Sequence, residues 1–260
     1  MSKFIIFDTE TTGLKVEVNQ IAQLSYMIID KELNILKSKN FYFKVKKVEN
    51  KASEINGLTV EKLEKLSGGK SFKDFSEEIF KDFNNSKIIC HNVKFDLEYL
   101  TEEFKRINMD LNVKGSFCTM LNYKDKLKIK HEKFGYKFPK LEEVIKFLDV
   151  KEDIIKNVLS VITDDKNVGY HDARYDIACT YMVFKYLEYI YPRTDFEKFL
   201  EIEKPKKQPV SLEKEKIMEN ATEKKKTSFK IFTNLVEKLN LENRLKVLKE
   251  KYDLLTKKKI

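Results

Sequence analysis

The chain has 260 residues with a net charge of +9, 42% of them are hydrophobic, and its 19 Phe and 12 Tyr supply apolar surface for a substantial core. These values predict one large globular domain with an appendage and exclude a large multidomain assembly. Apolar runs fall far short of the ~20 residues of a membrane helix, and the N-terminus lacks the hydrophobic region of a signal peptide. We therefore expect a cytoplasmic protein with no membrane interaction.

The first part of the chain predicts three strands in succession. The apolar run at residues 3–7 is typical of a buried strand, and it ends at the polar stretch 8–13. Residues 21–29 predict a second strand, and the alternation of apolar and polar residues over 41–45 predicts a third. Three successive strands would form a meander, and the first of them delivers acidic residues at its C-terminal end.

Helices and strands alternate in the following part. Ser71 and Asp74 resemble a capping box, and apolar residues after them recur with helical spacing until residues 84–85. Residues 121–138 are rich in lysine and show no assignable pattern. The other expected elements are a strand at 88–90, a helix from 93 capped by Asn92, a strand at 116–118, a helix at 141–148, and a long helix capped by Asp172 that ends near 191–192. This order predicts an α/β domain, a mixed sheet flanked by helices, of about 190 residues.

Four carboxylates stand at the ends of elements that could converge. Asp8 and Glu10 follow the first strand, and Asp96 and Asp176 each lie in the first turn of a helix. Alternation along an extended chain puts Asp8 and Glu10 on one side. Carboxylates that lie close together repel unless cations neutralise them, and an all-oxygen ligand set selects Mg²⁺ or Mn²⁺ over zinc. The pattern predicts a site for two such ions, although each carboxylate alone could be a solvated or helix-capping residue.

Three segments in chain order resemble the motifs of the DnaQ-like DEDDh 3′-5′ exonucleases. They are DTETTG at 8–13, HNVKFD at 91–96 and HDARYD at 171–176. Further segments at 55–59, 139–148 and 178–180 are similar to the proofreading epsilon subunits of bacterial DNA polymerase III, which belong to that family. The resemblance covers about residues 3–190 and leaves the tail out.

The resemblance implies an RNase H-like fold and a two-metal 3′-5′ exonuclease. Asp8, Glu10, Asp96 and Asp176 would be the metal ligands, and His171 the general base. An ordinary histidine has a pKa of about 6.5 and can accept a proton near neutral pH, whereas a carboxylate bound to metal is a poor base. The alternative is that His171 orients a loop through hydrogen bonds.

By the same resemblance, the substrate-binding residues would be Thr11, Thr12, Gly13 and Leu14. Gly13 would permit close approach of the backbone to the terminal nucleotide, and Leu14 would wedge against the last base. Both could instead be turn and core residues. His91, in the second motif, could be read as another base, but we expect it to hydrogen-bond backbone groups.

The expected substrate is the single-stranded or frayed 3′ end of DNA, in proofreading or repair during replication. RNA is the alternative, because related histidine-type enzymes trim RNA ends or short oligoribonucleotides. A third hypothesis is a catalytically inactive adaptor of the replisome. The presence of all five motif residues argues against it, since lost ligands are expected in such a protein.

The expected domain organisation is an exonuclease domain at 1–192, a charged linker at 193–227 and a basic amphipathic helical tail at 228–260. Residues 201–260 carry 17 basic and 10 acidic side chains, against 34 and 32 in residues 1–200. Such a tail favours a polyanion or a partner protein, although it could also be solvated. Its apolar faces need burial against this domain, a second copy or another protein, such as a polymerase.

Overall fold

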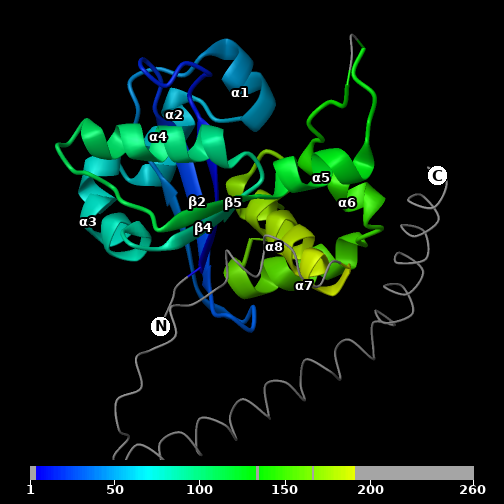
Figure 1. Ribbon diagram of the computed structural model, residues 1–260. Helices are drawn as coiled ribbons and strands as arrows, with labels where there is room; N and C mark the ends of the chain where they lie inside the picture. Colours follow the sequence, from blue (N-terminus) through cyan, green and yellow to red (C-terminus); the bar gives the residue numbers. More distant parts are fainter. Residues whose placement is uncertain (1–3, 133–134, 166, 191–260) are drawn as a thin grey trace, which may run out of the picture. The chain divides into compact units, whose positions relative to one another are not determined.

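The computed structural model describes residues 4–132, 135–165 and 167–190 (Figure 1). A five-stranded sheet lies at its centre, with the strand order β3-β2-β1-β4-β5. The strands are β1 (Phe4–Thr11), β2 (Ile21–Ile29), β3 (Ile35–Tyr42), β4 (Lys87–Cys90) and β5 (Gly115–Cys118). The linker predicted at 193–227 and the tail predicted at 228–260 lie outside the described residues.

β1 is the middle strand, and its two neighbours run in opposite directions. It pairs antiparallel with β2 and parallel with β4, so that Ile6 lies opposite Met27 on one side and Ile89 on the other. β3 extends the antiparallel half, and β5 extends the parallel half. The expected mixed sheet is confirmed, and the carboxyl ends of β1, β4 and β5 lie at the same edge.

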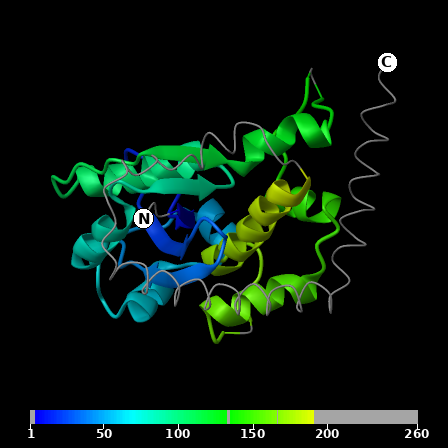
Figure 2. The ribbon, with the colours of Figure 1, turned by 60° about the horizontal axis from the view of Figure 1, so that its bottom comes forward.

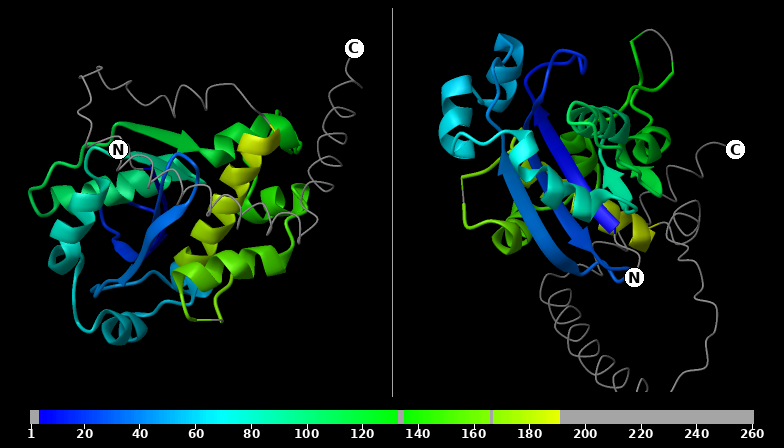
Figure 3. Two further views of the ribbon diagram at one scale, coloured as in Figure 1. Left: turned by 90° about the horizontal axis from the view of Figure 1, so that it is seen from below. Right: turned by 90° about the vertical axis from the view of Figure 1, so that its left-hand side faces the viewer.

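Helices cover both faces of this sheet. They are α1 (Asn50–Asn56), α2 (Val60–Ser67), α3 (Phe72–Phe83), α4 (Val93–Lys105), α5 (Thr119–Leu127), α6 (Leu141–Phe147), α7 (Glu152–Ile162) and α8 (Ala173–Ile190). α3 and α4 lie on one side of the strands, whereas α7 and α8 lie on the other (Figures 2 and 3). No helix among the described residues is both long and apolar enough to cross a membrane.

Aromatic side chains fill the layer between the sheet and helices α3 and α4. Ile5 and Phe7 of β1 are fully buried there. The ring of Phe83 meets that of Phe7 edge-on, with centroids 5.3 Å apart. Full burial of a side chain of this size contributes about 1.5–3 kcal/mol, so this layer anchors β1 firmly. Because side chains alternate along a strand, Asp8 and Glu10 project from the opposite face, towards α8.

Two strands differ from their predicted limits. β1 does not end at Phe7 but continues to Thr11, because its polar half keeps pairing with β2 up to an irregularity at Glu10 and Thr11. β3 begins at Ile35 and ends at Tyr42, so the predicted strand at 41–45 overlaps only its end. The alternation over 41–45 instead reflects the burial of Phe43 and other apolar side chains just beyond the strand.

Four helices were not predicted from the sequence. α1 buries no residue, so it lacks the apolar stripe by which helices are recognised. α2 is short and buries only one apolar side chain, Leu63. α5 lies largely in the lysine-rich stretch 121–138. α7 did carry a signal, since it buries Ile154, Ile155 and Leu159.

Two of the three predicted helix caps are confirmed. The capping box of α3 is present, with the backbone N–H and the hydroxyl of Ser71 both donating to Asp74 Oδ2 at 2.7 Å. Asn92 occupies the cap position of α4, but its side chain makes no capping bond. Asp172 does cap α8, because its Oδ1 accepts the N–H of Arg174 at 3.0 Å.

Candidate active site

Three segments of the chain bring four carboxylates together. Asp8 and Glu10 come from the polar end of β1, Asp96 from the first turn of α4, and Asp176 from the first turn of α8. α4 follows β4 directly, so the parallel pairing of β1 with β4 carries Asp96 to the end of β1. The convergence expected from the sequence is therefore seen.

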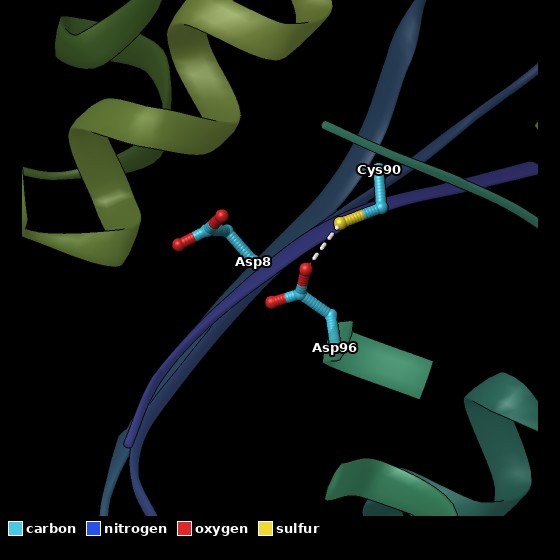
Figure 4. A group of neighbouring side chains, drawn as sticks. All are labelled: Asp8, Cys90 and Asp96. Atoms are coloured by element: carbon cyan, nitrogen blue, oxygen red, sulfur yellow. Dashed lines mark hydrogen bonds between the residues drawn. The ribbon is translucent and has the colours of Figure 1, made fainter. Parts of the chain in front are cut away.

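The ligand atoms form two adjacent groups. One group, drawn in Figure 4, consists of Asp8, Cys90 and Asp96, whose ligand atoms lie within 4.8 Å of one another. In the other, atoms of Glu10, His171 and Asp176 lie within 4.8 Å of one another. Each group has two carboxylates, and each could hold one divalent ion with all-oxygen ligation.

Asp96 is oriented by three donors. Its Oδ1 accepts hydrogen bonds from the backbone N–H of Thr9 at 3.0 Å and from the Thr9 hydroxyl at 2.7 Å. Its Oδ2 accepts the thiol of Cys90 at 3.0 Å. Cys90 was not predicted from the sequence, because a cysteine at the end of an apolar strand resembles an ordinary core residue.

Burial and mutual repulsion raise the pKa values of the clustered carboxyl groups. Burial, followed by the charge of Asp176, raises the pKa of Glu10 to about 9. Burial, followed by the charges of Asp172 and Asp96, raises the pKa of Asp176 to about 7. The pKa of Asp8 is also well above its ordinary value, for the same two reasons. Without cations these carboxyl groups resist ionisation, and bound divalent cations would stabilise their ionised form.

We predict that the metal-free protein loses stability as pH rises. A carboxyl group with a raised pKa in the folded state contributes stability below its unfolded pKa, and this is lost as pH rises through the folded pKa. For Asp176 and Glu10 the window runs from about pH 4 to about 9. In EDTA the melting temperature should fall by roughly 5 °C or more between pH 5 and pH 9. Calorimetry measures this.

Mg²⁺ should reverse the loss, with a larger effect at pH 8 than at pH 5, because ionised carboxylates bind it. The matched variant is Glu10→Gln, which should show a flatter pH dependence in EDTA. A wild-type melting temperature in EDTA that is equal at pH 5 and pH 8 would contradict the prediction.

His171 lies in the turn before α8 with its side chain exposed to solvent. Its backbone has a φ of 67°, in the left-handed region that few non-glycine residues adopt. Its N–H donates to Asp176 Oδ2 at 3.1 Å, which ties the turn to the carboxylate cluster. The ring is therefore open to solvent and close to Glu10 and Asp176.

A partly buried polar clamp joins this turn to the sheet. The side-chain amide of Gln23, in β2, donates to Asp172 Oδ1 at 2.9 Å, and its carbonyl accepts the N–H of Ala173 at 3.3 Å. Asp172 in turn receives two hydrogen bonds from the guanidinium of Arg174, at 2.9 and 2.7 Å. Because Gln23 is opposite Glu10 in the β1–β2 register, the clamp sets the position of His171 relative to Glu10.

Gln23→Ala should lower kcat by about 10- to 100-fold, because displacing His171, the predicted general base, by about 1 Å costs that much. The KM should change by less than about threefold, since the carboxylates stay in place. Steady-state kinetics at saturating metal separates the two. Asn40→Ala is the control, because Asn40 accepts from Gln23 at 2.8 Å but makes no described contact with the turn. Equal losses in both variants would mean that the clamp has only a structural role.

His91 has the structural role that was expected. One ring nitrogen, Nδ1, lies 2.9 Å from Thr119 Oγ1, and the other, Nε2, lies 3.1 Å from Pro139 O. The carbonyl can only accept, so Nε2 carries the proton and donates it. Burial lowers the pKa of His91 to about 4. The ring is neutral and both of its nitrogens are hydrogen-bonded, so it joins the start of α5 to the segment before α6.

The segment from Thr11 to Leu14 begins with the last residue of β1, beside the cluster. Thr11 and Thr12 are buried, whereas the side chain of Leu14 is 80% exposed. Packing explains why residue 13 is glycine, because a Cβ on Gly13 would lie 2.4 Å from Glu49 Cδ. Their contact with a substrate stays a prediction, and the exposure of Leu14 is compatible with the wedge.

A mixed sheet in this order, with helices on both faces and acidic groups at the end of its middle strand, has the architecture of an RNase H-like domain. The family model described as exonuclease matches residues 5–184, so the chain belongs to the exonuclease family. The family resemblance seen in the three motifs is thereby confirmed.

Relatives and solved structures agree with this family. The DNA polymerase III subunit epsilon of Buchnera aphidicola subsp. Schizaphis graminum is 31% identical over 144 residues, which cover 51% of this chain and 57% of the relative. The PolC-type DNA polymerase III of Mycoplasmopsis pulmonis is 29% identical over 119 residues, 45% of this chain and 8% of that protein. The structure of E. coli exonuclease I in complex with a dT13 oligonucleotide has a TM-score of 0.56 at 20% identity, covering 72% of this chain and 41% of that chain. This last likeness shows the fold.

Proposed function

We propose that the protein is a 3′-5′ exonuclease that hydrolyses DNA by a two-metal mechanism. The observation that carries the proposal is the convergence of Asp8, Glu10, Asp96, His171 and Asp176, from three distant segments, on one site. The family membership supports hydrolysis of phosphodiester bonds. The chain spans just over half the length of the epsilon relative, 57%, so the activity of the whole protein is part of the proposal.

The residues fit a pair of Mg²⁺ or Mn²⁺ ions. Asp8 and Asp96 would hold one, and Glu10 and Asp176 the other. Cys90 fits this set as a donor, because burial, followed by the charge of Asp96, raises the pKa of its thiol well above the ordinary value. A thiol that keeps its proton orients Asp96 and does not compete as a soft ligand.

Bound divalent ions supply activation of the attacking water and stabilisation of charge on the departing 3′ oxygen. The residues of the chain supply the geometry and the proton transfer. His171 accepts the proton of the attacking water and releases it to solvent through its exposed ring. Thr9 and Cys90 hold Asp96 in one orientation, and the clamp from Gln23 holds the turn that carries the base.

The proposed substrate is a single-stranded or frayed 3′ end of DNA. The names of the epsilon and PolC-type relatives assign them to DNA polymerase III, and the exonuclease I structure contains a dT13 oligonucleotide. We include proofreading or repair, and a polymerase partner for residues 228–260, in the proposal on this basis. A mispaired 3′ end frays more easily and should be removed faster than a paired one.

One experiment tests the activity and its polarity. Purified protein is incubated with 5′-labelled single-stranded DNA or RNA, with a free or a blocked 3′ end, in Mg²⁺, Mn²⁺ or EDTA. Stepwise shortening of DNA that requires a free 3′ end and a divalent ion supports the proposal. Cleavage of circular single-stranded DNA would contradict an exonuclease, and faster shortening of RNA would transfer the proposal to RNA.

A further inference from the structure

The excess positive charge of the segment that matches the exonuclease family, residues 5–184, is concentrated in one stretch. Residues 5–184 carry 30 basic and 29 acidic side chains, but residues 124–140 alone carry seven lysines and two acidic residues. The rest of the segment is therefore acidic, with 23 basic and 27 acidic side chains. A surface of that sign repels a nucleic acid strand, so within this segment attraction has to come from a local basic element.

The lysine-rich residues form the end of α5 and the hairpin that joins α5 to α6, the green segment that projects above them in Figure 1. We call the described residues of this stretch, 124–132 and 135–140, the basic arm. His131 N–H donates to Gly135 O at 3.0 Å, and Lys137 N–H donates to Ile129 O at 2.9 Å. These bonds pair the two sides of the hairpin with each other.

The arm is rooted at the active-site edge of the sheet. His91 follows β4 directly, and its ring joins Thr119, at the start of α5, to Pro139, at the end of the arm. The same short stretch after β4 leads into α4 and Asp96. His91 thus holds the start of α5 and the end of the arm close to the N-terminus of α4, the helix that carries Asp96, a proposed metal ligand.

The exposed side chains of the arm combine positive charge with an aromatic ring. Lys128 and Lys130 are exposed, and the ion pairs formed among the described residues include neither of them. Phe138 is 51% exposed, and Lys124 Nζ lies 4.3 Å from the centre of its ring. Lysines next to an exposed aromatic ring suit a single strand, because phosphates meet the ammonium groups while a base stacks on the ring.

We propose that the basic arm binds the single-stranded nucleic acid several nucleotides from the 3′ end held at the carboxylates. This inference rests on the proposed function and adds a second contact for the strand. Terminal hydrolysis needs only the carboxylates and His171, whereas capture of a long strand needs the arm. Strands too short to reach the arm gain nothing from it.

The test compares two double variants. Lys128→Gln with Lys130→Gln changes the arm, and Lys73→Gln with Lys81→Gln is the matched control on exposed lysines of α3, on the other side of the sheet. For a 20-nucleotide oligo(dT), the arm variant should lose about tenfold in kcat/KM and keep kcat. The slope of log kcat/KM against log salt concentration should become shallower by about 1.4, because the variant lacks two lysines and each phosphate that is no longer neutralised reduces the slope by about 0.7. For a trinucleotide, kcat/KM should change by less than about twofold.

Binding is measured separately by fluorescence anisotropy of labelled oligo(dT) in EDTA, where hydrolysis plays no part. Weaker binding by the arm variant than by the control supports the inference even if the wild type hydrolyses nothing, which would defeat only the proposed function. An active wild type together with an arm variant that equals the control on the 20-nucleotide strand would overturn the inference. In that case the arm is a surface for another protein or for solvent.

Discussion

Replacing Asp8 or Asp176 by asparagine should lower kcat by at least about 10³-fold. Each substitution removes one carboxylate from a proposed ion site, and with it both the placement of the attacking water and the stabilisation of the leaving oxygen. The fold should survive, because asparagine has the shape of a protonated aspartate, and burial already raises the pKa of both groups. Single-turnover hydrolysis of 5′-labelled DNA at saturating Mg²⁺ measures the loss.

Asp82→Asn is the matched control. Asp82 is as buried as the site carboxylates, but it accepts the hydroxyl of Tyr26 at 2.7 Å and pairs with Lys37, on the opposite side of the sheet from the cluster. It should lower the melting temperature and leave kcat within about twofold of wild type. Near-normal turnover in Asp8→Asn would refute the assignment of the site, since no other carboxylate of the cluster can reach the place that Asp8 occupies.

Replacing His171 should lower kcat by about 10² to 10⁴-fold while leaving metal binding in place. His171→Asn is the preferred variant, because asparagine tolerates the φ of 67° and cannot act as a base. The acidic limb of the pH–rate profile should weaken in the variant. Calorimetric titration with Mg²⁺ should give affinities close to wild type, which separates this loss from that of the carboxylate variants.

Chemical rescue sharpens the test of His171. In His171→Gly the backbone keeps its left-handed conformation without strain, and the exposed position admits a small molecule. Added imidazole should restore part of the activity of this variant and none of that of Asp8→Asn. Absence of rescue combined with an unchanged pH profile would point to another base and leave His171 with the loop-orienting role.

The structure bears out the convergence of Asp8, Glu10, Asp96 and Asp176 that the sequence predicted. A short apolar strand followed by polar residues, and two helices with an acidic first turn, are local patterns, and parallel pairing places such ends at one edge. The limits of β3 were wrong, because pairing partners and not alternation decide where a strand stops. The short helices were missed for a similar reason, since α1 depends on its neighbours and carries no apolar stripe.

The sequence by itself determined the α/β class of fold, because local periodicity predicts the strands and helices, and the resemblance of its three motifs to an exonuclease family singled out the acidic residues and the histidine of the candidate site. Only the tertiary structure revealed the thiol of Cys90 on Asp96, the clamp from Gln23 to Asp172 and the anchoring of the basic arm by His91. These contacts join residues whose pairing no local pattern encodes. Geometry of that kind exists only once the sheet has brought the strands side by side.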